Sequence, residues 1–148
     1  MGSFLKAVER DAIVARLGQL APNTERRWGR MTAPQMIAHL TDQMTHTLGH
    51  VEATQLYGWR RNRLARWLAI YVLPWPKGRI KGPADAFVTE PGEWQRDIER
   101  LVSLIEEFTA ADTHTVCPPH ALLGPMSRND WGAFCWKHFD HHLRQFGV

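Results

Sequence analysis

The chain of 148 residues is 44% hydrophobic and 22% charged, with a formal net charge of +3 and an isoelectric point near 9.2. This length supports a core without disulfide bonds, so we expect residues 1–148 to form a single domain. The basic excess is too small to indicate a nucleic-acid-binding protein by itself. The two cysteines, Cys117 and Cys135, form no CxxC pair, which predicts reduced thiols and a cytoplasmic location.

The sequence also predicts that no segment crosses a membrane. Residues 1–11 mix acids and bases where a signal peptide requires an apolar core. The longest apolar run, residues 67–75, contains Pro74 and is shorter than the roughly 20 residues that a spanning helix needs. We therefore expect neither a signal peptide nor a transmembrane segment.

The first third of the chain predicts two long helices. Apolar residues recur at helical spacing over residues 4–20, and a proline-containing turn follows. A second helix is expected from residue 33 to residue 48 or 50, because Thr32 and Gln35 have the spacing of a capping box. His39 lies within the apolar arc of this helix, among Met36, Ile37, Leu40 and Met44.

The middle of the chain, residues 49–83, is largely irregular. A short helix is expected over residues 62–72, with an apolar side made by Leu64, Trp67, Leu68 and Tyr71. Prolines and glycines then exclude regular structure until about residue 91. A connection of this length between two helices predicts a crossover along a bundle instead of a tight hairpin.

Two more helices complete the pattern. One is expected over residues 90–109, and the other from Ser127 to Gly147, with Asp130 as the acidic partner of the Ser127 cap. No segment shows the alternation of a strand. The sequence therefore predicts an all-α four-helix bundle with a long crossover between the second and third helices.

Histidines on the last helix suggest a metal site. His138 and His142 are four residues apart, so both rings lie on one face and reach a single ion. Neutral imidazole is a common ligand of zinc and nickel, and two such rings need a third ligand from another element. The alternative is a chance cluster on a surface helix, and for His39 it is a core histidine that bonds to a neighbour.

Three blocks of sequence resemble a known group of proteins. They are WGRMTAPQMIAHL at residues 28–40, GPMSRNDWG at 124–132 and KHFDHHLRQF at 137–146, with a looser match in LPWPKG at 73–78. Together they resemble the DinB/YfiT-like superfamily of metal-binding four-helix bundles and, within it, the DUF1569 branch. The resemblance implies an up-down-down-up bundle with a divalent metal ion, zinc or nickel, held by His39, His138 and His142.

The resemblance also implies a class of activity. Three histidine ligands leave coordination positions open for water or substrate, as in catalytic sites. Members of the superfamily include transferases that use low-molecular-weight thiols such as bacillithiol or mycothiol, and related hydrolases. We therefore expect a metal-dependent thiol transferase or hydrolase that acts on a small molecule, with a non-catalytic metal-binding bundle as the alternative. Homodimers are common with this type of fold, although the sequence locates no interface.

Several neighbours of the three histidines are candidates for supporting roles. His46 is either a fourth ligand or general base, or a residue that lines a cavity, and His141 either assists catalysis or lies at the surface. Cys135 is expected to face the same interior as His138. The residues that we expect to orient ligand rings, or else to be solvated, are Asp42, Asp140 and Gln145.

A second hypothesis concerns the short helix over residues 60–72. Its arginines, with the aromatic residues Trp59, Trp67 and Tyr71, resemble a basic amphipathic helix that binds an acidic membrane surface or nucleic acid. Lys77, Arg79 and Lys81 extend the charge. The alternative, which the small net charge favours, is that the apolar side packs on the bundle and the arginines are solvated, so nucleic acid is an unfavoured partner.

Overall fold

The computed structural model describes residues 2–78, 88–112 and 115–148, and within these ranges it is all-helical, as the sequence predicts. Strands are absent from the described parts of the chain, where the sole β-type pairing is an isolated antiparallel bridge between His120 and Gly124. The α-helices are α1 (Ala7–Leu17), α2 (Ala33–Leu48), α3 (Arg63–Trp67), α4 (Trp94–Ala110) and α5 (Arg128–Gln145).

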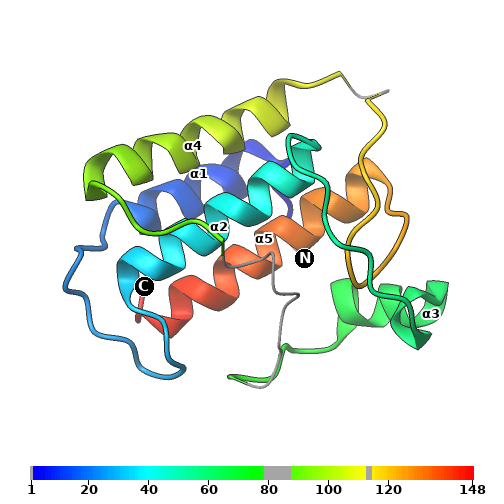
Figure 1. Cartoon of the computed structure of the whole chain (residues 1–148), viewed down its shortest axis with the longest axis horizontal. Coiled ribbons are helices and arrows are strands. Elements are labelled where there is room, and N and C mark those ends of the chain that lie inside the picture. The colour runs from blue at the N-terminus through cyan, green and yellow to red at the C-terminus, as the bar shows by residue number, and fades with distance from the viewer. Residues whose placement is uncertain (1, 79–87, 113–114) are drawn as a thin grey trace.

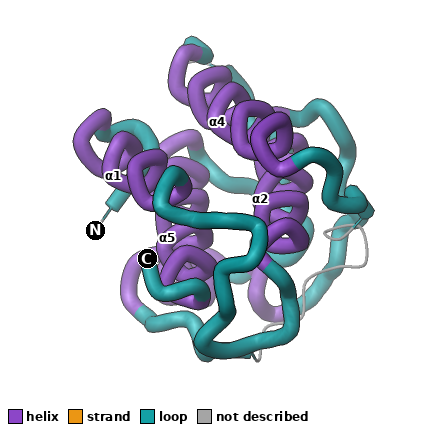
Figure 2. Tube along the Cα trace, turned by 90° about the vertical axis from the view of Figure 1, so that its left-hand side faces the viewer, coloured by secondary structure: helices purple, strands orange, loops and turns teal. Residues whose placement is uncertain are grey.

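The four longest helices lie side by side, and Figure 2 shows them nearly end-on. Helix α2 packs against α4 and α5, and α1 packs against α5. Their facing sides are apolar, and Ile13, Leu40, Ile105 and Phe139 are at most 1% exposed. Since α2 and α5 are neighbours, side chains on their facing surfaces meet inside the protein.

Both helices that carry the predicted ligands begin where the sequence predicts. The Thr32 hydroxyl accepts a hydrogen bond from the backbone of Gln35, whose side chain accepts one in return from the backbone of Thr32. Ser127 and Asp130 form the equivalent pair at the start of α5. These reciprocal bonds satisfy amide groups that have no partner within the helix, and they fix its first turn.

Two other helix starts differ from the prediction. Helix α1 begins at Ala7 instead of residue 4, because Phe4 is fully buried and packs edge-on against Phe139 before the helix starts. Helix α4 begins at Trp94 instead of residue 90, because the Glu93 carboxylate accepts hydrogen bonds from the backbone amides of Gln95 and Arg96. A side chain that caps a helix cannot itself lie inside it.

The short helix in the middle of the chain continues as a π turn over Leu68–Val72, which packs against α5, and α3 is at the lower right of Figure 1. The predicted apolar side is wrong for Leu64 and Trp67, which are 63% and 51% exposed, whereas Ile70 is fully buried. A π turn holds more residues than an α turn, so the side chains after residue 67 do not continue the face of Leu64 and Trp67.

Some predictions fall on positions that the structure does not describe. Arg79, Lys81, Gly82 and Pro83 lie outside the described residues, as does part of the loop expected before α5. Among the described helices, none combines the length and the apolar character needed to span a lipid bilayer.

Candidate metal centre

Three histidine rings meet between α2 and α5. The Nε2 atom of His138 lies 3.1 Å from Nε2 of His39 and 3.0 Å from Nε2 of His142. All three side chains are buried, and their ligand atoms lie within 4.8 Å of one another. The three predicted ligands are therefore together, with one nitrogen of each ring facing a common point.

The packing of the two helices explains this meeting. His138 and His142 are one turn apart on α5, and His39 is the residue of α2 that faces them, with its ring 5.1 and 5.0 Å from theirs. Aromatic residues close the other side, since the rings of Trp75 and Phe134 lie 5.4 and 5.5 Å from that of His138. The cluster therefore lies in an apolar environment.

The protonation of His142 follows from its neighbours. The backbone carbonyl of Trp28 only accepts hydrogen bonds, so the atom of Gln145 that lies 2.9 Å from it is the amide nitrogen. The amide oxygen of Gln145 then faces Nδ1 of His142 at 3.0 Å, and Nδ1 must carry the proton. The Nε2 atom of His142 is left with a free lone pair, as a metal ligand requires.

A glycine at position 29 allows the Gln145 side chain to approach the backbone closely. Gly29 has φ +83°, and a Cβ atom added there would collide with the side-chain amide of Gln145. Both the backbone conformation and the close approach favour glycine at this position. The Trp28–Gly29 pair of the sequence thus orients Gln145, which in turn orients His142, as predicted for Gln145.

Asp42 and Asp140, the other two residues predicted to orient ligand rings, have different partners. Asp42 accepts hydrogen bonds from the backbone amides of Val88 and Thr89, each at 3.1 Å, and from the Thr89 hydroxyl. Asp140 binds two arginines, Arg16 of α1 at 2.9 Å and Arg144 at 3.0 Å.

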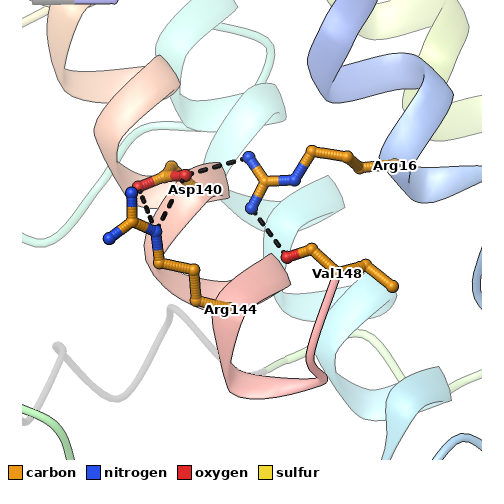
Figure 3. A network of polar contacts seen from close by, with 4 residues as sticks. All are labelled: Arg16, Asp140, Arg144 and Val148. Atoms are coloured by element: carbon orange, nitrogen blue, oxygen red, sulfur yellow. Dashed lines mark hydrogen bonds and ion pairs between the residues drawn. The ribbon is translucent and has the colours of Figure 1, made fainter.

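Figure 3 shows the second of these networks, in which Arg16 also donates to the backbone carbonyl of Val148. Asp140 therefore ties α1 and the end of the chain to α5, and Asp42 ties residues 88–89 to α2. Both roles depend on contacts between distant parts of the sequence, which helical spacing does not reveal.

The remaining neighbours lie outside the cluster. Nδ1 of His46 lies 3.0 Å from the carbonyl of Val51, about 10 Å along α2 from His39. His141 is half-buried, with its ring 5.3 Å from that of His142 and 4.7 Å from that of Trp28. Cys135 is fully buried, and burial raises the pKa of its thiol to about 12, so it carries no thiolate near neutral pH.

Burial also controls the charge of the cluster. Burial, together with the nearby His39, lowers the pKa of His142 to about 3. Burial lowers the pKa of His138 well below the usual value, with contributions from His142 and His39. Both rings are therefore neutral at pH 7, which is the form that binds metal ions.

The spacing of the nitrogens fits a metal ion. Two nitrogens bound to one zinc at about 2.0–2.1 Å in tetrahedral geometry lie about 3.4 Å apart, close to the 3.0 and 3.1 Å observed. The buried Nδ1 of His138 has no hydrogen-bond partner in the described part of the chain. An ion bound at Nε2 of His138 would require the proton of the neutral ring to lie on Nδ1.

A cleft of about 300 Å³ reaches the cluster from outside, and His39 forms part of its wall. The cleft is bounded by the start of α2 on one side and by residues 89–91 on the other. Its lining residues are Arg30, Met31, Gln35, His39, Thr89, Glu90 and Pro91. The volume lies at the lower end of the range for small-molecule sites, about 300–1,000 Å³.

Sequence reasoning missed several residues of the site. The ring contact of Trp75 with His138 was not predicted, although Trp75 belongs to the proline-rich block at residues 73–78. The sequence does not indicate that Thr89 and Glu90 line the cleft, because their position depends on the hydrogen bonds from Val88 and Thr89 to Asp42.

Fold and site together define an all-helical protein with a buried cluster of three histidines that could hold one metal ion. The chain belongs to the family described as protein of unknown function (DUF1569), whose model matches residues 4–147. No curated protein and no solved structure matches the chain.

Proposed function

We propose that the chain binds one divalent transition metal, zinc or nickel, through His39, His138 and His142. The observation that carries this proposal is the convergence of three buried Nε2 atoms, two of them 3.0 and 3.1 Å from the third. We further propose that residues 1–148 form one DinB/YfiT-like domain. It would be an up-down-down-up four-helix bundle with its long crossover between α2 and α4.

The proposed activity is metal-dependent thiol transfer or hydrolysis on a small molecule in the cytoplasm. A bound divalent ion supplies a Lewis acid that favours ionisation of a water or thiol near neutral pH. The protein contributes three histidine side chains, an apolar surround that includes Trp75 and Phe134, and a cleft that admits a small molecule beside His39. His141, half-buried next to His142, is the residue best placed to assist.

The first test is the metal content of protein purified without a chelator or a histidine tag. We expect about one metal ion per chain in the wild type and a sharp loss in His39→Ala, His138→Ala and His142→Ala. His46→Ala is the matched control, since it removes a histidine of α2 outside the cluster and should retain the metal. Circular dichroism verifies that each variant remains helical.

Two results would contradict the proposal. One is a wild-type chain that takes up neither zinc nor nickel after reconstitution. The other is a variant of the cluster that is helical and retains the full metal content. Once binding is established, low-molecular-weight thiols and electrophiles should be screened for turnover, and that turnover should disappear in His138→Ala.

A non-catalytic role for the metal is the second candidate function. The burial of all three histidines favours it, because an ion held by α2 and α5 would join these helices as a structural site does. This alternative predicts a large loss of thermal stability on chelation and no turnover with any thiol or ester. A catalytic role instead predicts turnover that is lost on chelation and returns when the metal is added back.

A further inference from the structure

The segment before and within α3 exposes large apolar side chains. Tyr57 is 84% exposed, Trp59 74%, Leu64 63% and Trp67 51%. Isolated exposed apolar residues are common, but several within eleven consecutive positions mark an interaction surface. We call the set Tyr57, Trp59, Arg60, Arg63, Leu64 and Trp67 the aromatic–basic surface.

The members of this surface lie close together on one short segment, residues 57–67. Arg63 and Leu64 are four and three residues before Trp67, so the three side chains are neighbours on the outer side of α3. Trp59 and Arg60 come from the 3₁₀ turn Trp59–Arg61 directly before it, and the Arg60 guanidinium lies 5.3 Å from the Trp59 ring. Cations and apolar rings therefore alternate over one face.

The two other arginines of the segment make contacts within the protein. Arg61 donates to the side-chain oxygen of Gln55 at 3.0 Å and stacks over Tyr57, and Arg66 donates to the carbonyl of Leu123 at 3.3 Å. At the far end, the Lys137 ammonium donates to three backbone carbonyls, those of Ala69, Ile70 and Leu73. Arg60 and Arg63 are thus left to face outward on an anchored support.

The charge of the segment is of one sign. Residues 53–78 contain five cationic side chains and no acidic one. The chain as a whole has 18 basic and 15 acidic residues, so this stretch concentrates the excess. A partner that covers the surface must therefore supply negative charge as well as an apolar region.

We propose that the aromatic–basic surface docks on an anionic lipid membrane. Trp59, Leu64 and Trp67 enter the interface between headgroups and acyl chains, where tryptophan is favoured, while Arg60 and Arg63 contact anionic headgroups. The cytoplasmic leaflet supplies such lipids, and each arginine near it contributes attraction that salt weakens. This inference is independent of the proposed metal chemistry.

Two other occupants fit the surface less well. A two-fold contact with a second copy would place the same patch against itself, with Arg60 and Arg63 facing their own like charges. Nucleic acid would pair with the arginines and stack on the tryptophans, but it has no use for exposed aliphatic side chains such as Leu64, Val72 and Leu73.

Cosedimentation of the full-length chain with vesicles tests the proposal. We expect binding to vesicles of phosphatidylcholine with phosphatidylserine, no binding to phosphatidylcholine alone, and weaker binding at high salt. Because each basic residue contributes about five-fold, Arg60→Gln/Arg63→Gln should weaken binding about 30-fold. Trp59→Ala/Trp67→Ala should also weaken it, whereas Arg96→Gln/Arg100→Gln, an equal loss of charge on the exposed side of α4, should leave it within two-fold.

Several outcomes would overturn the proposal. They are a wild-type chain that ignores anionic vesicles, an equal loss of binding in the α4 control, and tight binding of RNA or duplex DNA without vesicle binding. A dimer in sedimentation equilibrium that Trp59→Ala/Trp67→Ala dissociates would equally show that a second copy covers the surface. Loss of metal in His138→Ala should not change vesicle binding, which separates this test from that of the proposed function.

Discussion

Replacing Gln145 tests whether the environment of His142 controls metal affinity. The side chain is 2% exposed and makes two hydrogen bonds, one to Nδ1 of His142 and one to the Trp28 carbonyl. Gln145→Leu keeps the approximate volume and removes both. Gln145→Glu retains an acceptor for His142 but puts an oxygen next to the Trp28 carbonyl.

The two variants should separate stability from affinity. In Gln145→Leu, a buried N–H of His142 and the carbonyl of Trp28 lose their partners, so we expect a loss of about 2–4 kcal/mol in the free energy of unfolding. Without its acceptor, His142 no longer favours the tautomer that binds metal, and the dissociation constant should rise about 10–100-fold. Gln145→Glu should also be less stable, but its metal affinity should stay within about three-fold of the wild type.

Competition with a chromophoric zinc chelator measures the affinities, and urea unfolding of the metal-free proteins measures stability. Both variants should be assayed at a temperature where they remain fully helical. Equal metal affinity in Gln145→Leu and the wild type would refute the reasoning about the tautomer. An equal loss of affinity in both variants would instead mean that Gln145 acts only through the stability of the fold.

Two further predictions concern stability and local order. His120 is buried, and burial lowers its pKa to about 4, so it stays neutral in the folded chain while the unfolded chain takes up the proton near pH 6.5. Stability is therefore lost as pH falls, and His120 should account for about 2 kcal/mol of the decrease between pH 7 and pH 5 in urea unfolding. His120→Asn, which keeps an acceptor for the amides of Leu122 and Leu123, should remove that part of the decrease, whereas a decrease as steep as that of the wild type would contradict the assignment. Lys137→Met should lower stability by about 1–3 kcal/mol and speed hydrogen exchange at residues 68–73, because three backbone carbonyls lose their donor; unchanged exchange there would show that the π turn holds without Lys137.

The parts of the fold that depend on local sequence were predictable. Capping pairs gave the starts of α2 and α5, and the spacing of His138 and His142 placed both rings on one face. The third predicted ligand, His39, could be paired with them through the resemblance to a family, because helical spacing alone does not tell which face of α2 meets α5. The all-helical class followed from the absence of alternating segments.

The parts that depend on distant contacts were not predictable. Asp42 and Asp140 were expected to orient ligand rings or else to be solvated, but their carboxylates bind residues 47 and 124 positions away in the sequence, Thr89 and Arg16. The predicted apolar side of the short helix was wrong for Leu64 and Trp67 of α3, because the π turn over Leu68–Val72 changes the register and periodicity assumes a uniform helix.

The bonds between Asp42 and residues 88–89 have a consequence for how the site can be altered. Asp42 lies three residues after His39 on α2, so one rigid helix carries both a histidine of the cluster and the attachment of the segment that walls the cleft. Met31 and Glu90 also line that cleft. Under the proposed function, substitutions at these two positions should change which molecules enter the cleft while leaving the three histidine nitrogens in place, so selectivity and metal affinity would be separately adjustable.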